Sequence, residues 1–210
     1  QNNHITSLST ENTVLQNYSK LMGSNYNSIT KLDGRQPISL EVQHLTNILP
    51  NKYAVTDKAD GERHFLYITN NNVYIINTNL VVKFTGITLS KKEESFNNSI
   101  LDGEYIFIKS KNRYLFLVFD CLFSKGVDMR KKVNLFDRLK EADLVINACF
   151  VYDDHKTFYD HLKSESLPLN NGSLDMKKLE TNLTNYMKDI NFCLTLSTNK
   201  NKPIIRRKYF

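Results

Sequence analysis

The stretch His64-Phe65-Leu66-Tyr67-Ile68-Thr69-Asn70-Asn71-Asn72-Val73-Tyr74-Ile75-Ile76-Asn77 decides the fold class of this chain. Two runs rich in β-branched and aromatic residues flank the asparagines, and such runs predict strands over 64–69 and 73–77. Asparagine tolerates the left-handed backbone conformation that tight hairpin turns require, so the asparagines predict a hairpin turn. The sheet is therefore expected to be antiparallel here.

Other segments show residue patterns typical of strands or of helices. Runs of β-branched and aromatic residues predict further strands over 53–56, 81–85, 100–101, 105–109, 114–121 and 150–152. Apolar residues at helical spacing predict helices over 39–49, from an N-cap at Asn134, and over 174–190. Residues 164–173 predict a loop and 203–210 a basic strand. We therefore expect an α+β fold with largely antiparallel sheets and flanking helices.

Length and residue order bound the domain organisation. At 210 residues the chain is long enough for one main domain. Residues 1–30 are polar with only a weak apolar pattern, and we expect a linker or the tail of a preceding domain there, with the main domain over 31–210. No apolar run approaches the roughly 18–20 residues of a membrane helix, and the N-terminus lacks a signal-peptide core. We expect an intracellular protein without a membrane partner.

Charge and cysteine content narrow the possible partners. The net charge of +6 and the pI near 9.1 suit a polyanionic partner such as RNA, although many basic proteins bind no nucleic acid. Cys121, Cys149 and Cys193 lack the short paired spacings of a zinc site, so reduced, buried thiols are expected. The terminal run Arg206-Arg207-Lys208 predicts either a solvated edge or a path for RNA.

The candidate catalytic residues lie in the run Lys58-Ala59-Asp60-Gly61-Glu62-Arg63. The run lies between two predicted strands, and its glycine lets backbone approach a ligand closely. An amine attacks phosphorus only when deprotonated, so a nucleophilic lysine needs a nearby cation, a metal or burial to favour its neutral form. Arg63 and a metal ion are the candidates here. The alternative is a charged turn in which Lys58 and Arg63 are solvated.

A second cluster favours the chemical interpretation. Asp102-Gly103-Glu104 opens a predicted strand, and Phe119-Asp120 closes its partner. Together with Lys58-x-Asp60-Gly61-x-Arg63, these residues resemble, in order and spacing, three motifs of the lysine-dependent nucleotidyltransferases. That family comprises the mRNA capping guanylyltransferases and the nucleotide-dependent polynucleotide ligases. The resemblance covers residues 36–140 strongly and Ile204 to Phe210 more weakly, and it implies the nucleotidyltransferase fold.

The resemblance implies a role for each matching residue. Lys58 would be the nucleophile that forms a phosphoramidate with a nucleoside monophosphate. Arg63 would contact the ribose or a phosphate, and Glu104 would contact the ribose or assist a metal, Mg²⁺ or Mn²⁺. Phe119 would stack on the purine, although an aromatic residue in an apolar strand is more often part of the core.

Two departures from the family pattern stand out. The family commonly has a sugar-contacting arginine shortly after the first hairpin, where this sequence has Ile76-Asn77-Thr78-Asn79. We expect Lys83 to contact the sugar in its place. The sequence also reaches Phe210 without the fourth and fifth motifs or the final domain of the family. We therefore expect the nucleotidyltransferase fold to be incomplete at the C-terminus and these 210 residues alone to be inactive.

The residue two positions before the lysine bears on the choice of base. Ligases of the family usually carry a glutamate there, which accepts a hydrogen bond from the adenine amino group. This sequence has Thr56, whose hydroxyl can also donate and so fits the carbonyl oxygen of guanine better. The flanking segment 53–57 resembles capping enzymes of large DNA viruses more than ligases.

The resemblance therefore favours an mRNA guanylyltransferase that takes GTP and the 5′ end of RNA as substrates. It further implies triphosphatase and methyltransferase domains in the same chain or complex, and a place in the host cytoplasm or the virion if the protein is viral. An ATP-dependent ligase adenylation domain is one alternative. A non-catalytic nucleotide- or RNA-binding module is the other.

Overall fold

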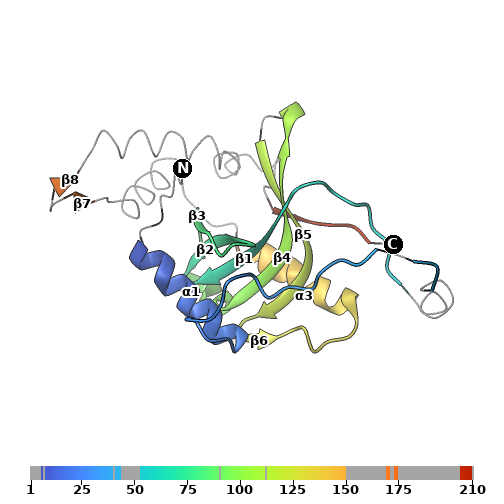
Figure 1. Ribbon diagram of the computed structural model, residues 1–210, viewed down its shortest axis with the longest axis horizontal. Coiled ribbons are helices and arrows are strands. Elements are labelled where there is room, and N and C mark those ends of the chain that lie inside the picture. The colour runs from blue at the N-terminus through green and yellow to red at the C-terminus, as the bar shows by residue number, and fades with distance from the viewer. Residues whose placement is uncertain are drawn as a thin grey trace.

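A single antiparallel sheet organises the part of the chain that the computed structural model describes, which is residues 6, 8–39, 41–43, 53–89, 91–111, 113–149, 169–170, 173–174 and 204–209. Its seven strands have the order β3-β2-β1-β4-β5-β6, with β9 added beside β5 (Figure 1). The strands are β1 (Glu62–Thr69), β2 (Asn72–Asn77), β3 (Val82–Thr88), β4 (Ser99–Ile108), β5 (Arg113–Ser124), β6 (Val127–Asp128) and β9 (Ile204–Arg206).

Helices and short elements complete the described part. The helices are α1 (Leu8–Met22) and α3 (Leu135–Ala148), with 3-10 turns η1 (Lys91–Phe96) and η2 (Lys109–Lys111). A separate hairpin joins β7 (Leu169–Asn170) to β8 (Ser173–Leu174). The predicted α+β class with a largely antiparallel sheet is confirmed, since β9 runs parallel to β5 and the other described pairs are antiparallel.

The first hairpin forms as the sequence predicts. Asn70 and Asn71 adopt φ of 51° and 63°, the left-handed conformation for which asparagine is favoured. The side chain of Asn97 holds this turn, because its Oδ1 accepts a hydrogen bond from the Asn71 amide at 2.8 Å. The turn thereby fixes the β1–β2 register, which pairs Thr69 with Asn72.

Helix α1 occupies residues for which we expected a linker. Its buried side chains Val14, Tyr18 and Met22 recur every four residues and so form one face. The Tyr18 ring lies 6.3 Å from that of Phe65 and 6.2 Å from that of Tyr67 on β1. The expectation of a linker is therefore wrong for 8–22, because three apolar residues on one face suffice to dock an otherwise polar helix.

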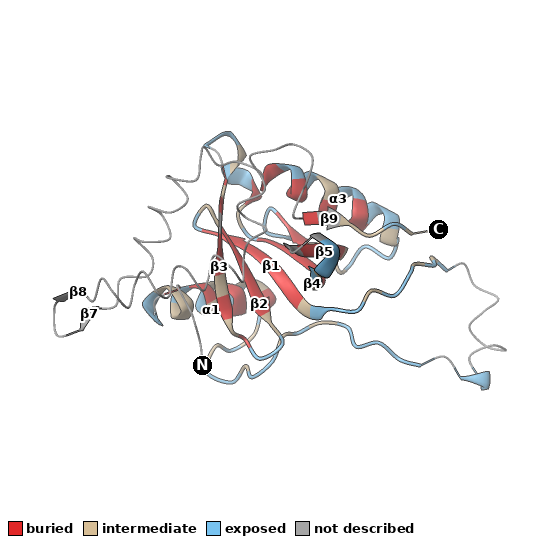
Figure 2. Ribbon diagram, turned by 90° about the horizontal axis from the view of Figure 1, so that it is seen from above, coloured by how far each residue is buried: buried red, intermediate tan, exposed pale blue. Residues whose placement is uncertain are grey.

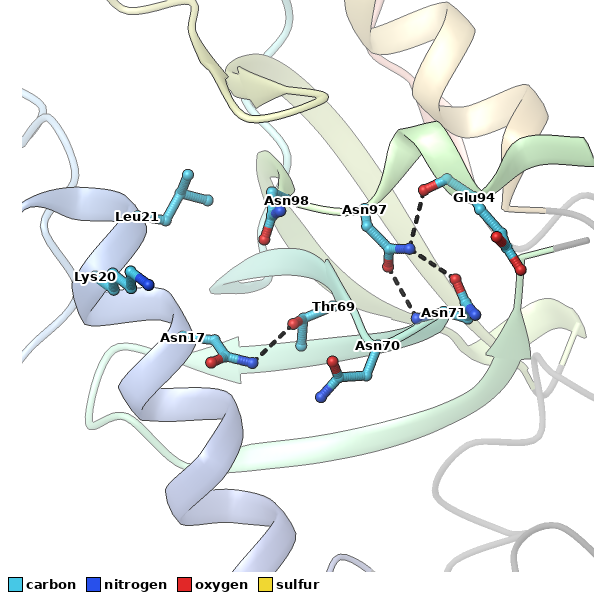
Figure 3. A pocket seen from close by; sticks show the side chains of 9 residues that line it. All are labelled: Asn17, Lys20, Leu21, Thr69, Asn70, Asn71, Glu94, Asn97 and Asn98. Carbon is cyan, nitrogen blue, oxygen red and sulfur yellow. Dashed lines mark hydrogen bonds between the residues drawn. The ribbon is translucent and has the colours of Figure 1, made fainter. Parts of the chain in front are cut away.

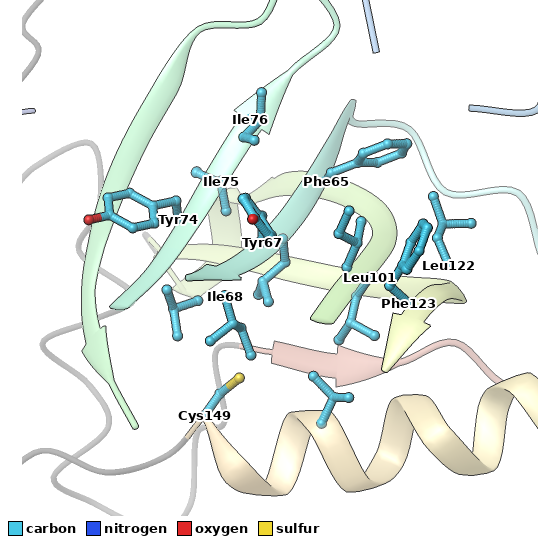
Figure 4. Close-up of a cluster of buried hydrophobic side chains, with 14 of the residues drawn as sticks. Phe65, Tyr67, Ile68, Tyr74, Ile75, Ile76, Leu101, Leu122, Phe123 and Cys149 are labelled. Carbon is cyan, nitrogen blue, oxygen red and sulfur yellow. The ribbon is translucent and has the colours of Figure 1, made fainter. Parts of the chain in front are cut away.

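Both faces of the sheet are covered. Figures 1 and 2 place α1 on one side of the sheet and α3 on the other, which explains why β1 is buried on both faces. Figure 4 shows side chains of β1, β2, β4 and β5 meeting in one cluster near the end of α3. The predicted start of α3 is confirmed, because the Asn134 side chain accepts a hydrogen bond from the Phe136 amide at 2.9 Å.

Several other predictions have outcomes here. The second hairpin, β4 and β5, and the terminal strand β9 are confirmed. Residues 53–56 are not a strand: they lie in a segment without regular structure that runs to residue 60. The strand predicted over 150–152 and most of the helix over 39–49 and of the loop over 164–173 lie outside the described residues. The helix predicted over 174–190 also lies outside them except for Leu174, which belongs to β8.

Two further expectations concern thiols and membranes. Cys121 and Cys149 are free and buried, as expected, and burial raises the pKa of each thiol. Cys193 lies outside the described residues. Across the described part of the chain, no helix combines the length and the apolar character needed to cross a membrane.

Replacing Val14 tests whether α1 belongs to the core. The Val14 side chain is 1% exposed, so Val14→Ala should lower the free energy of unfolding by about 2 kcal/mol through lost burial and a small cavity. Leu8 on the same helix is 72% exposed, and Leu8→Ala should change it by less than about 0.5 kcal/mol. Urea denaturation of both variants measures the difference, and equal effects would show that the helix does not depend on this face.

Candidate active site

The loop that carries Lys58 leads directly into β1. Lys58 is exposed and lies in the extended segment that ends at Asp60. Gly61 then allows the chain to join the sheet, because a Cβ there would lie 2.7 Å from the Tyr105 carbonyl oxygen on β4. The glycine of the motif thus serves close backbone packing rather than a turn with positive φ.

Thr56 ties this loop to the far end of the chain. Its hydroxyl donates a hydrogen bond of 2.7 Å to the carbonyl oxygen of Lys208. The hydroxyl hydrogen is therefore already used and cannot be donated to a guanine carbonyl in this conformation. The predicted contact of Thr56 with guanine stays a prediction, and it would require the hydroxyl to leave the Lys208 carbonyl oxygen or to act as an acceptor.

Arg63 lies at the centre of the site. Its guanidinium binds Asp102 through two bonds, Nε to Oδ1 at 3.1 Å and Nη2 to Oδ2 at 2.6 Å, and its Nη1 donates to the carbonyl oxygen of Arg35. Burial raises the pKa of Asp102 to about 6 even though the hydrogen bonds and charge of Arg63 lower it. Gly34 fits against this group, since a Cβ there would lie 2.5 Å from Nη2 of Arg63.

Strand alternation decides which predicted residues share a face. Arg63 pairs with Glu104 across β1 and β4, so both side chains lie on the same face of the sheet. His64, the next residue, lies on the opposite face, and Lys83 lines a cavity beside it. The structure therefore brings Arg63 and Glu104 together and does not bring Lys83 to them. The expected contact of Lys83 with the sugar stays a prediction, and in this geometry it would have to be made from the other face.

A β-bulge presents Phe119 on the face of Arg63. The β4–β5 register passes from Asp102 opposite Asp120 to Gly103 opposite Val118, which leaves Phe119 as the extra residue. Bulges of this kind redirect a side chain and leave one residue outside the ladder. The Phe119 carbonyl oxygen accepts a hydrogen bond from the Tyr209 hydroxyl at 3.0 Å instead. Its ring lies 5.8 Å from Cζ of Arg63, which places it beside the predicted ribose contacts.

Arg207 joins this face from the segment after β9. Its amide donates to the Val118 carbonyl oxygen at 2.7 Å, and its Cζ lies 5.2 Å from the centre of the Phe119 ring. Its Nη2 lies 3.6 Å from Oε1 of Glu104. Both side chains are mostly buried, and Oε2 of Glu104 and Nε and Nη2 of Arg207 have no hydrogen-bond partner among the residues that the structure describes.

Comparison with known proteins matches this arrangement to a family. Residues 2–185 match the family model described as mRNA capping enzyme, catalytic domain. The chain belongs to this family. The match includes the residues of α1, in agreement with the packing of that helix against β1.

Two curated relatives are similar to parts of the chain. A "Probable mRNA-capping enzyme" of Acanthamoeba polyphaga mimivirus is 34% identical over 192 residues, which is 89% of this chain and 15% of that protein. The "mRNA-capping enzyme subunit alpha" of Schizosaccharomyces pombe is 31% identical over 124 residues, or 51% of this chain and 30% of that protein. The chain thus spans less than a third of the length of either relative.

Ion pairs organise the acidic residues of this capping-family site. Each of three carboxylates on the face faces an arginine from a different part of the chain: Asp102 faces Arg63, Glu104 faces Arg207, and Asp120 binds Arg138 of α3 at 2.8 Å. Among the described residues, no group of three or more His, Cys, Asp or Glu side chains could hold a metal. Glu104, the tentative metal ligand, already faces a guanidinium cation.

Sequence reasoning missed two residues of the site. Asp102 belongs to the Asp-Gly-Glu motif, but its contact with Arg63 was not predicted. Asp102 and Glu104 are two positions apart on one strand, so the sequence already indicated that both side chains lie on the same face of the sheet as Arg63. Arg207 lies in the run Arg206-Arg207-Lys208, whose three side chains have different surroundings. Arg206 binds Asp143 on α3 at 2.8 Å, and Lys208 is exposed. A continuous basic path for RNA along this run is therefore not what the structure shows.

Two other hollows lie apart from the face of Arg63. One of about 530 Å³ lies on the opposite face and is lined by Asp60, Gly61, Glu62, His64, Lys83, Tyr105 and Phe107. Another, of about 680 Å³, lies between α1 and the β1–β2 turn and is lined mostly by polar side chains (Figure 3). Asn17, Thr69, Asn71 and Asn97 bond to one another or to nearby backbone there, so their polar groups are largely satisfied within the protein.

The buried His64 predicts a pH dependence of stability. Burial lowers the pKa of His64 below its ordinary 6.5, although its ring nitrogen Nδ1 lies 3.0 Å from the Glu62 carbonyl oxygen. Unfolded chains therefore take up the proton first, and the folded state loses stability as the pH falls below 6.5. Denaturant titrations of the wild type and His64→Gln from pH 7 to about 5 should show a loss in the wild type that the variant lacks. A constant difference between the two would contradict this assignment.

Proposed function

We propose that this chain is the nucleotide-accepting part of an mRNA guanylyltransferase, which takes GMP from GTP and passes it to the diphosphate 5′ end of RNA. One observation carries the proposal: in a chain of the capping family, the loop of Lys58 leads into β1, whose Arg63 shares a face with Glu104 and Phe119, and Thr56 of this loop bonds to Lys208 beside Arg207. Arginine and carboxylate groups suit phosphate and sugar oxygens, and the aromatic ring suits a purine.

The proposed reaction has two displacements at one phosphorus. The neutral amine of Lys58 attacks the α-phosphorus of GTP, a P–N bond forms, the P–O bond to pyrophosphate breaks, and the amine loses a proton. A terminal phosphate oxygen of the RNA diphosphate then attacks the same phosphorus. The P–N bond breaks, the lysine nitrogen regains a proton, and GMP is joined to RNA. The exposure of Lys58 is compatible with an acceptor as large as RNA.

The arginine that faces Glu104 disfavours its predicted role as a metal ligand. Glu104 fits poorly as a ligand of Mg²⁺ or Mn²⁺, because a cation bound to it would lie beside the guanidinium of Arg207, whose Nη2 is 3.6 Å away. A Mg²⁺ or Mn²⁺ ion is proposed to enter with the phosphates of GTP, which are its usual ligands in nucleotide sites.

The proposal also covers the choice of GTP as substrate, the associated domains, the RNA partner and the location. Both relatives are named as capping enzymes, which supports GTP over the ATP of a ligase. The mimiviral relative is far longer than this chain, which is compatible with fusion to triphosphatase and methyltransferase domains. We propose RNA 5′ ends as the partner, and the host cytoplasm or the virion as the location of a viral version. A non-catalytic binding module would keep GTP binding and form no adduct.

Labelling with radioactive nucleotide tests the nucleophile. The full-length wild-type protein incubated with α-labelled GTP and Mg²⁺ should give a labelled band on a denaturing gel, and ATP in parallel should give little. Lys58→Ala should abolish the band because no amine remains to form the P–N bond. Lys131→Ala, which removes another exposed lysine, should retain it. A band that persists in Lys58→Ala would contradict the assignment, and preferential labelling by ATP would favour the ligase.

The role of Phe119 is tested by removing its ring. Phe119→Ala should weaken GTP binding by about 1–3 kcal/mol, the usual contribution of an aromatic ring stacked on a base. Phe107→Ala is the matched control, because that ring belongs to β4 and lines the hollow on the opposite face. Equilibrium binding with a fluorescent GTP analogue measures both variants. Equal weakening would mean that Phe119 acts only through general stability.

A further inference from the structure

The strongest unexplained feature of the site is a set of buried polar atoms without partners. Within the described part of the chain, Oε2 of Glu104 and Nε and Nη2 of Arg207 are such atoms. The Glu104 and Arg207 side chains are only 21% and 13% exposed, and leaving buried polar atoms unpaired costs about 1–3 kcal/mol each. Such a cost is tolerated in native sites where a ligand supplies the missing partners.

The pair defines the chemistry of that ligand. Arg207 can only donate hydrogen bonds, whereas the ionised carboxylate of Glu104 can only accept them. Their nearest atoms, Nη2 and Oε1, are 3.6 Å apart, which is too long for a good direct bond and short enough for both groups to reach one oxygen atom. A hydroxyl group satisfies both, because it donates its hydrogen and accepts through its oxygen. A phosphate would satisfy Arg207 but would be repelled by Glu104.

The surroundings place that hydroxyl on a nucleoside. Arg207 lies over the Phe119 ring at 5.2 Å, so a ligand that binds the pair also meets the aromatic side chain. Arg63 lies over the same ring at 5.8 Å. A nucleoside whose base contacts Phe119 has its ribose hydroxyls within a few ångströms of the ring.

We propose that Arg207 is a substrate-binding residue that, together with Glu104, holds the 2′-hydroxyl of the GTP ribose. The pair thereby selects ribonucleotides over deoxyribonucleotides. This inference rests on the proposed function. It gives Arg207 the sugar contact that we expected from Lys83, which the structure places on the other face of the sheet. Two hydrogen bonds hold the contact in position. The Arg207 backbone amide donates to the Val118 carbonyl oxygen, and the Tyr209 hydroxyl donates to the Phe119 carbonyl oxygen.

Binding of nucleotides that lack one hydroxyl tests the proposal. All proteins carry Lys58→Ala, so that equilibrium binding is measured without adduct formation. The parent protein should bind GTP about 10- to 100-fold more tightly than 2′-deoxy-GTP, the range expected for a hydrogen bond to charged groups. The analogue 3′-deoxy-GTP keeps the 2′-hydroxyl and should bind within about threefold of GTP. Arg207→Ala should bring the affinities for GTP and 2′-deoxy-GTP within about threefold, and the preference for GTP over ATP should remain.

Two further variants keep the test decisive if Arg207→Ala folds poorly. Arg207→Lys keeps a positive charge next to Glu104 but loses the planar fork, and it should lose most of the discrimination. Arg206→Ala removes the neighbouring arginine, which binds Asp143, and it should keep the discrimination of the parent protein. Thermal unfolding of each variant, monitored by circular dichroism, identifies those that are folded.

The outcomes separate this inference from the proposed function. GTP binding with unchanged discrimination in folded Arg207→Ala or Arg207→Lys would overturn the role of Arg207 and leave the guanylyltransferase proposal standing. Loss of the GTP over ATP preference instead would show that Arg207 contacts the guanine edge, which also overturns the ribose contact. Absence of GTP binding to the parent protein, with no labelled adduct in the wild type, would overturn both proposals.

Discussion

The bidentate ion pair of Arg63 and Asp102 is the interaction on which the site depends. Asp102 is 4% exposed on its side chain, so its charge is stable in the sheet only while the guanidinium faces it. Removing one partner of such a pair typically costs about 3–5 kcal/mol, because the other charge is left buried and unpaired. The same guanidinium bonds to the Arg35 carbonyl oxygen and lies beside the Phe119 ring. One side chain thus joins β1, β4, β5 and the segment before the Lys58 loop.

Close packing around β4 imposes the second constraint. A Cβ on Gly103 would lie 2.6 Å from the Leu117 carbonyl oxygen and 2.7 Å from the Phe116 ring. Side chains larger than hydrogen are excluded at this position, and the bulge at Phe119 begins next to it. The Asp-Gly-Glu motif therefore combines a buried acid, a residue without a side chain and an acid that faces Arg207. Each requirement comes from a different neighbour, which explains why the three residue types occur together.

The elements that could be predicted from the sequence are those with a local cause. Asn70 and Asn71 specify the first turn by their own backbone preferences, and Asn134 caps α3 through a bond two residues away. Helix α1 was missed because its apolar face is narrow and gains stability only against β1. Residues 53–56 have strand-like composition, yet they take an extended path outside the ladder, with Thr56 bonded to Lys208. Arg63, Glu104 and Phe119 were identified together, whereas Arg207 depends on a pairing between β9 and β5 that no local signal specifies.

The link between Thr56 and Lys208 also has a consequence for the order of folding. It joins residues 152 positions apart, and the Tyr209 bond to Phe119 spans 90 positions. Contacts of such long separation form late, because closing a long loop costs entropy before any contact compensates it. During synthesis, the sheet from β1 to β5 can pair well before residues 204–209 leave the ribosome. The loop of Lys58 therefore gains its contact with residue 208 only after the strands from β1 to β5 have had time to pair.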